Sequence, residues 1–295
     1  MQPVHLLAVI AINALFGSAY ALGKVGVDHF PPYLFVALRA GLVSLALLPF
    51  LRFRAVKKQQ WPYLLLFSMM MGVAVFAAMY QALSLAATVS PIVIGTQLSV
   101  PFAVLLGFIF LKEPVRLTVL VAIAVAFGGI VVIAFDPSLL NSLDALFWCA
   151  IMALAYGAST VLSRGLKDLD ARVMNAWMAV LSGPVMLALS LTFESGQMDA
   201  LRTAEWLDWA MVVHAAIGVS VLGHVSMFAL LKRYPVAMVM PFYVLTPIFG
   251  VFYSILLFNE GMTLQTGLGA LMVLGAIYYI NRQGKTVRRH RKQPV

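Results

Sequence analysis

Ten apolar runs, each long enough to cross a lipid bilayer as a helix, recur along the chain. A transmembrane helix needs about 20 predominantly apolar residues, and short polar connections separate the runs. Only 11% of the residues are charged, whereas a soluble domain carries about 25%. The sequence therefore predicts an all-α integral membrane protein with ten transmembrane helices. The runs are residues 5–27, 32–50, 61–84, 89–111, 117–135, 143–163, 171–193, 207–231, 235–258 and 263–280.

The distribution of lysine and arginine predicts how these helices are oriented. Basic residues favour the cytoplasmic loops of membrane proteins. If the N-terminus is cytoplasmic and the chain alternates across ten spans, 17 of its 20 basic residues fall on the cytoplasmic side. Lys24 and Arg202 fall outside, and Arg39 lies within the second span. We therefore expect both termini in the cytoplasm, with residues 281–295 as a basic cytoplasmic tail.

The net charge of +9 needs no nucleic-acid partner, because the basic residues follow the membrane orientation and form no water-exposed face. Cys149 is the single cysteine and has no partners at metal-ligand spacing. An intramembrane enzyme would need clustered histidine and acidic ligands, or a nucleophile with its base, and the spans contain no such cluster. We therefore expect no catalytic residue, no metal and no cofactor.

The two halves of the chain resemble each other. Gly-Ser-Ala at 17–19 in the first run matches Gly-Ala-Ser at 157–159 in the sixth. A proline followed by a terminal glutamate marks the fourth and ninth runs, as Pro101 with Glu113 and Pro247 with Glu260. The matches predict two related units.

These units cover residues 5–135 and 143–280 and contain five spans each. Five is an odd number of crossings, so the second unit must be inserted upside down relative to the first. Inverted repeats of this kind are typical of secondary transporters, whose binding sites lie near the bilayer midplane between the repeats.

Two segments carry a resemblance to a known family. Residues 82–93 read Ala-Leu-Ser-Leu-Ala-Ala-Thr-Val-Ser-Pro-Ile-Val and lead to Pro101 and Glu113, and residues 37–40 read Ala-Leu-Arg-Ala. This pattern resembles the EamA domain of the drug/metabolite transporter superfamily, in which a helix with a mid-span proline ends in a glutamate-containing turn. The second half repeats the pattern but lacks a counterpart of Arg39.

The resemblance implies two inverted five-helix EamA repeats and transport by alternating access. It also implies a central cavity lined mainly by the first, third, fourth, sixth, eighth and ninth spans, with the second span at the periphery. Bacterial members commonly export amino acids and related metabolites, and other members move sugars, nucleobases or drugs.

Charged and titratable groups within the spans are few. All eleven carboxylates lie in loops or at the ends of the runs, so a proton relay on a buried acid is not expected. His214 and His224 are the buried titratable candidates, and each could instead be a neutral histidine bonded to a neighbouring helix. Arg39 would cost at least about 2.5 kcal/mol if unpaired at this depth. It is either a structural anchor or a contact for an anionic substrate group.

Uncharged polar residues within the spans are the remaining candidates for the walls of the cavity. They could contact substrate or simply bond across helices, which stabilises a membrane bundle by about 0.6 kcal/mol per bond on average. Together with both histidines, the substrate-binding candidates are Asn13, Ser18, Tyr20, Tyr80, Gln81, Gln97, Trp148, Tyr156, His214, His224 and Tyr243.

Prolines and glycines predict how the helices bend and pack. Pro101 and Pro247 remove a backbone hydrogen bond, so we expect each to kink its helix and shape a gate. Glu113 and Glu260 are interpreted as locks that close turns on opposite membrane faces. Glycines in the fifth and tenth runs allow close helix approach, within a monomer or at a homodimer face.

The combined interpretation is a carrier in the bacterial inner membrane that moves a small-molecule substrate out of the cell. We expect amino acids, aromatic or otherwise neutral, as its cargo. A carrier of a nucleobase, sugar or cationic drug is the alternative. A membrane enzyme is disfavoured because the spans contain no catalytic cluster, and a receptor is disfavoured because it has no reason to keep an inverted repeat.

Overall fold

The computed structural model describes residues 2–112, 114–136, 142–234 and 239–290, and every regular element among them is a helix. Seven helical stretches in these ranges are long and apolar enough to cross a membrane, and three shorter apolar helices accompany them. Together these ten stretches correspond to the ten predicted runs. The all-α transmembrane fold is therefore confirmed.

The helices of the first repeat follow the predicted runs closely. The third span contains α3, η4 and α4, and the fourth contains α5, η5 and α6. The bounds are α1 (Pro3–His29), α2 (Pro32–Ala46), α3 (Trp61–Phe67), η4 (Ser68–Val75), α4 (Phe76–Leu85), α5 (Ser90–Gly95), η5 (Thr96–Leu98), α6 (Ser99–Leu111) and α7 (Leu117–Ala134), with short 3₁₀ turns at Leu48–Phe50, Phe53–Ala55 and Lys58–Gln60.

The second repeat has the same order of spans. Its eighth span contains α11, η8 and α12, and its ninth is described from η9 onward. The bounds are α8 (Leu143–Leu162), η7 (Ser163–Leu166), α9 (Ala171–Phe193), α10 (Gln197–Thr203), α11 (Trp206–Val213), η8 (His214–Gly223), α12 (His224–Arg233), η9 (Met240–Val244), α14 (Leu245–Phe258) and α15 (Leu264–His290). Two features differ from the predicted boundaries. The short helix α10 occupies the loop after the seventh run, and α15 continues past residue 280 into the predicted tail.

The inverted repeat is visible in how the halves pack, because the first helix of each repeat crosses the fourth span of the other. A Cβ added to Gly17 of α1 would lie 2.7 Å from the backbone nitrogen of Gly250 in α14. A Cβ added to Gly157 of α8 would lie 2.8 Å from the backbone nitrogen of Ala103 in α6. The glycines matched by sequence are thus equivalent points of close approach between the two repeats.

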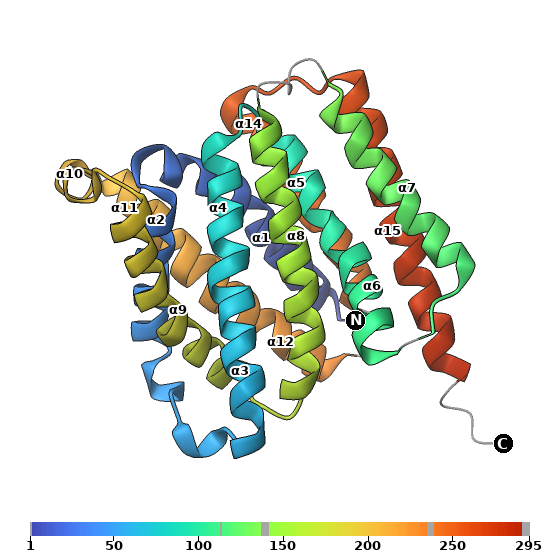
Figure 1. Cartoon of the computed structure of the whole chain (residues 1–295), viewed down its shortest axis with the longest axis horizontal. Helices are drawn as coiled ribbons and strands as arrows, with labels where there is room; N and C mark the ends of the chain where they lie inside the picture. Colours follow the sequence, from blue (N-terminus) through green and yellow to red (C-terminus); the bar gives the residue numbers. More distant parts are fainter. Residues whose placement is uncertain (1, 113, 137–141, 235–238, 291–295) are drawn as a thin grey trace.

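The fifth and tenth spans, α7 and α15, lie side by side along one edge of the bundle (right in Figure 1). Gly129 and Gly269 meet there, since a Cβ on Gly129 would lie 2.8 Å from the carbonyl oxygen of Gly269. Gly275 has open space around it instead. The predicted close packing therefore occurs within one chain.

The outer surface of the bundle suits a bilayer. Large apolar side chains such as Phe110 (71% exposed) and Leu271 (71% exposed) project from its helices. Exposing so much apolar surface to water would be unfavourable, whereas lipid tails solvate it. The chain is a multi-pass membrane protein.

Candidate functional site

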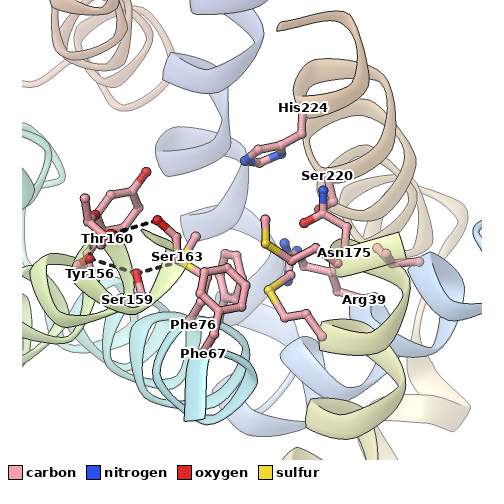
Figure 2. A pocket seen from close by; sticks show the side chains of 14 residues that line it. Arg39, Phe67, Phe76, Tyr156, Ser159, Thr160, Ser163, Asn175, Ser220 and His224 are labelled. Atoms are coloured by element: carbon pink, nitrogen blue, oxygen red, sulfur yellow. Dashed lines mark hydrogen bonds between the residues drawn. The ribbon is translucent and has the colours of Figure 1, made fainter. Parts of the chain in front are cut away.

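A cavity of about 210 Å³ lies between the second, third, sixth, seventh and eighth spans (Figure 2). Its walls combine one cation, several small polar groups, and aromatic and thioether side chains. The lining residues are Arg39, Val43, Phe67, Met71, Phe76, Tyr156, Ser159, Thr160, Ser163, Met174, Asn175, Met178, Ser220 and His224.

Arg39 of α2 supplies the positive charge of this cavity. The side chain is only 4% exposed, and its guanidinium carbon lies 3.6 Å from the centroid of the Phe76 ring. A guanidinium carries five N–H donors and no acceptor. Within the described part of the chain, no side chain or backbone group forms a hydrogen bond or ion pair with it. Its donors therefore face the cavity.

The opposite wall is a polar face of α8 that continues into η7. Tyr156, Ser159, Thr160 and Ser163 recur at the spacing of one helix face. The three hydroxyls donate to carbonyl oxygens of their own helix, at 2.7 to 2.9 Å (Figure 2). A hydroxyl that donates in this way keeps its lone pairs, so this wall can accept hydrogen bonds from a ligand.

The eighth span reaches the cavity through the π-helical segment η8 and the start of α12. Ser220 Oγ donates to the carbonyl of Ala215 at 2.6 Å, and His224 Nδ1 bonds the carbonyl of Val219 at 3.0 Å. Both bonds reach back five residues, which is the π-helical repeat. A carbonyl only accepts, so Nδ1 carries a proton, and Nε2 of a neutral ring at this position is an acceptor. The wider turn thus sets the direction of both side chains.

Three methionines, two phenylalanines and Val43 form the apolar part of the lining. Met174 and Met178 lie one turn apart on α9, and Met71 lies in the π-helical segment η4. Asn175, between the two α9 methionines, adds an amide to the same wall. Unbranched thioether side chains adapt to ligands of different shape. This part of the cavity can therefore accommodate apolar groups of varied outline.

Three of the residues expected from the sequence line this cavity: Arg39, Tyr156 and His224. This cavity includes the second and seventh spans, which the family-based expectation did not, whereas the expected central cavity lined also by the first, fourth and ninth spans stays a prediction. Close packing at Gly17 joins the first span to the ninth, and close packing at Gly157 joins the sixth span to the fourth. The candidates that lie outside the lining are Asn13, Ser18, Tyr20, Tyr80, Gln81, Gln97, Trp148, His214 and Tyr243.

Several of these outlying candidates bond across helices. His214 Nε2 lies 3.0 Å from the Ser18 hydroxyl and joins the eighth span to α1. Tyr20 Oη lies 3.2 Å from Thr96 Oγ1 and joins α1 to the fourth span. Tyr80 is buried, with its ring 4.8 Å from that of Phe35. These contacts match the interhelical role that the sequence left open for such groups.

Asn13 makes a further bond of this kind, between α1 and α14. Its side-chain oxygen accepts from Thr246 Oγ1 at 2.8 Å, and its amide nitrogen donates to the carbonyl of Val9 at 2.7 Å. The oxygen and the nitrogen of the Asn13 side-chain amide are therefore both hydrogen-bonded within the bundle.

The two kink prolines occupy equivalent places in the repeats. Pro101 and Pro247 are buried near the start of α6 and α14, and a 3₁₀ turn precedes each helix. Each lies beside the glycine crossing described above. The sequence prediction that they shape gates stays a prediction.

The predicted turn lock at Glu260 makes three contacts. Its carboxylate accepts from the backbone nitrogens of Val89 and Ser90, at 2.5 and 3.0 Å, and from the Ser90 hydroxyl at 2.6 Å. The turn after the ninth span thereby caps the start of α5 in the other repeat. Glu113, the other predicted lock, lies outside the described residues. The matched turns both begin with a left-handed residue, Lys112 and Asn259, each at φ 52°.

Glu194 forms a second carboxylate cap that the sequence did not single out. It accepts from the backbone nitrogens of Tyr33 and Leu34, at 2.7 and 3.1 Å, and so ties the end of α9 to the start of α2. Pro31 and Pro32 before these nitrogens are typical of a helix start, but nothing local identified their distant acceptor.

Comparison with known proteins assigns the family. A model of the EamA-like transporter family matches residues 4–135 and 143–282, which is nearly the whole chain. The chain belongs to the EamA-like transporter family. The match confirms the predicted family and the two EamA repeats. It makes the protein a transporter with a small-molecule substrate, in a family that is not an enzyme family.

This EamA-like transporter is similar over its length to several curated proteins. It is 24% identical to the "Uncharacterized transporter YoaV" of Bacillus subtilis, over 92% of this chain and 95% of that protein. It is 25% identical to a "Probable amino-acid metabolite efflux pump" of Salmonella typhimurium, over 95% of each chain. A protein of the same name from Escherichia coli is 23% identical, over 92% of this chain and 93% of that protein.

One solved crystal structure has the same fold. It superposes with a TM-score of 0.63 over 95% of this chain and 97% of that chain, at 16% sequence identity. At this identity the likeness supports the arrangement of the helices and nothing about the substrate.

Sequence reasoning missed several lining residues of this transporter. The polar face of α8 could have been found, because Tyr156, Ser159, Thr160 and Ser163 follow helical spacing within an apolar run. Asn175 is likewise an amide inside an apolar run. The methionines gave no such signal, since apolar residues face lipid, core and cavity alike in a membrane helix.

Proposed function

We propose that this transporter exports small apolar amino acids and related metabolites across the bacterial inner membrane by alternating access. The observation that carries the proposal is the cavity that contains Arg39. It offers a cation for a carboxylate, polar groups on α8 and η8, and an apolar thioether and aromatic wall. An apolar amino acid presents the complementary groups.

The size and charge of the cavity argue against a drug as cargo. Drug-sized ligands occupy pockets of about 300–1,000 Å³, whereas this cavity measures about 210 Å³. A cationic drug would also meet the like charge of Arg39. A sugar would find hydroxyl partners on α8 but an apolar surface across much of the remaining wall.

The predicted orientation favours loading from the cytoplasm. Ser163, Met174 and Phe67 line the cavity close to the loops at residues 51–60 and 163–172, which contain seven of the 20 basic residues. Under the positive-inside rule these loops are cytoplasmic, as are both termini. The opposite ends of the helices are held together by the Glu260 and Glu194 caps. A cavity near the cytoplasm with closed outer ends is the state in which an exporter takes up its cargo.

The names of two relatives support the same direction, since both are called amino-acid metabolite efflux pumps. We further propose that the working unit is a monomer. Gly129 and Gly269, the glycines best suited to helix pairing, already pack against each other within the chain.

Flux measurements in proteoliposomes test this function. Purified protein is reconstituted, and the movement of labelled phenylalanine, methionine, leucine, a hexose, a nucleobase and a quaternary ammonium drug is followed against protein-free liposomes. We expect phenylalanine, methionine or leucine to move. Flux of only the hexose, the nucleobase or the drug would overturn the amino-acid proposal, and no flux of any compound would contradict transport of these classes.

A further inference from the structure

Arg39 is a buried cation without a described anionic partner. The Arg39 side chain is 4% exposed, and its guanidinium lies over the face of the Phe76 ring. An aromatic face attracts a cation but accepts no conventional N–H hydrogen bonds. A carboxylate that entered this cavity would accept hydrogen bonds from the N–H groups of Arg39, for which no described residue is an acceptor.

The shape of the guanidinium indicates which chemical group Arg39 can bind. Its planar fork matches a carboxylate in a two-point contact, whereas a hydroxyl or a carbonyl can occupy only one of those positions. Asn175, on the same side of the cavity as Arg39 in Figure 2, can add a further donor. The geometry therefore points to a carboxylate as the group that Arg39 binds.

The rest of the lining offers no comparable binding partner for an ammonium group. None of the 14 lining residues is an aspartate or a glutamate. Neither the hydroxyls of α8 nor the ring of His224 carries a negative charge. An ammonium would also share a small cavity with the Arg39 guanidinium. The cavity therefore offers an opposite charge to the carboxylate of an amino acid but not to its ammonium group.

Resting on the proposed function, we infer that this transporter recognises its cargo as an apolar monocarboxylate, with Arg39 as the carboxylate-binding residue and the amino group dispensable. Deaminated forms of the transported amino acids bind at least as well as the amino acids themselves. The methionine and phenylalanine wall contacts the apolar tail. Decarboxylated amines with the same tail bind poorly.

Competition against labelled phenylalanine flux in proteoliposomes tests the inference on the unmodified protein. The inhibitors are 3-phenylpropionate and 2-phenylethylamine, which keep the ring and retain only the acid or only the amine. A second set uses labelled methionine with 4-(methylthio)butanoate and 3-(methylthio)propylamine. We expect each acid to inhibit at least as strongly as the unlabelled amino acid, and each amine about 30-fold or more weakly.

Variants assign the effect to Arg39. Arg39→Gln removes the charge and should weaken direct binding of labelled 3-phenylpropionate to the purified protein about 30-fold or more, whereas Arg39→Lys should restore part of it. Ser44→Ala is the matched control, because Ser44 lies on the same helix and bonds only its own backbone at Ala40 among the described groups. Monodisperse elution in detergent shows that each variant is folded.

The two proposals fail in different ways. Equal inhibition by the amine and the acid in the unmodified protein, or binding of 3-phenylpropionate that Arg39→Gln leaves unchanged, would overturn the carboxylate inference while transport of the amino acid remains. Absence of phenylalanine and methionine flux, with flux of a sugar or nucleobase instead, would overturn the proposed function.

Discussion

The carboxylate of Glu260 accepts a hydrogen bond from the Ser90 hydroxyl at 2.6 Å. The same carboxylate accepts from the backbone nitrogens of Val89 and Ser90, so it caps the first turn of α5. Since Glu260 follows the ninth span and Ser90 begins the fourth, this contact joins the two repeats at the predicted outer face. Movement of the two repeats apart at that face must break it.

Glu260→Gln should therefore destabilise the protein, because a neutral amide accepts more weakly and brings donors toward the backbone N–H groups. The expected loss is about 1.5–3 kcal/mol, the range for hydrogen bonds to a charged group. The midpoint of thermal unfolding in detergent measures it. Asp144→Asn is the control, because Asp144 accepts from the adjacent Ala145 nitrogen. Equal midpoints for the two variants would contradict a lock at Glu260.

The glycine crossings predict a second stability effect. Gly17→Ala and Gly157→Ala each place a methyl group under 3.0 Å from backbone atoms of α14 or α6, which cannot move as a flexible side chain can. We expect each to cost about 1–3 kcal/mol through overpacking and to reduce transport. Gly41→Ala, where nothing lies within 4 Å, should leave stability unchanged or raise it. Thermal midpoints and flux compare the three, and equal midpoints would contradict the close crossings.

Replacing Arg39 with an apolar residue should stabilise the protein but impair transport. A charge at membrane depth costs at least about 2.5 kcal/mol, whereas its cation–π contact returns about 0.5–2 kcal/mol. Arg39→Met should therefore raise the thermal midpoint while abolishing transport of a carboxylate cargo. A lower midpoint would instead identify Arg39 as the structural anchor that the sequence left open.

Ser18 and His214 predict a measurable coupling between α1 and the eighth span, since their side chains lie 3.0 Å apart. A double-mutant cycle of Ser18→Ala and His214→Ala should give about 0.6 kcal/mol, the average for such bonds in a membrane bundle. Ser254→Ala with His214→Ala is the control, because Ser254 donates to Gly250 within its own helix. Coupling in the control pair, or none between Ser18 and His214, would contradict the assignment.

The fold was largely predictable from the sequence because lipid imposes a simple rule. The backbone N–H and C=O groups of each span must be hydrogen-bonded within the span, so the described part of every predicted run is largely helical. The matched glycines at Gly17 and Gly157 and the matched prolines at Pro101 and Pro247 predicted the inverted repeat. The sequence did not predict the π-helical turns η4 and η8, because they depend on packing against neighbouring helices.

The candidate site was less predictable. Arg39, Tyr156 and His224 were identified because polar groups are rare in a span, but the same signal also selected Ser18, His214 and Tyr20, which bond across helices. Polarity alone does not tell a cavity wall from an interhelical contact. That distinction depends on which helices touch, and it followed here from the cavity lining and the interhelical hydrogen bonds.

Accessibility of a cysteine at Ser163, in a Cys149→Ala background, tests the central claim that cargo enters a cavity open to the cytoplasm. Ser163 lines the cavity at the start of η7, and Cys149 is the chain's only native cysteine. A membrane-impermeant maleimide is applied to inside-out and right-side-out vesicles, with and without a transported amino acid. We predict that Ser163→Cys reacts in inside-out vesicles and that the amino acid slows the reaction. Labelling only from the outer face, or labelling that a transported amino acid leaves unchanged, would contradict the account.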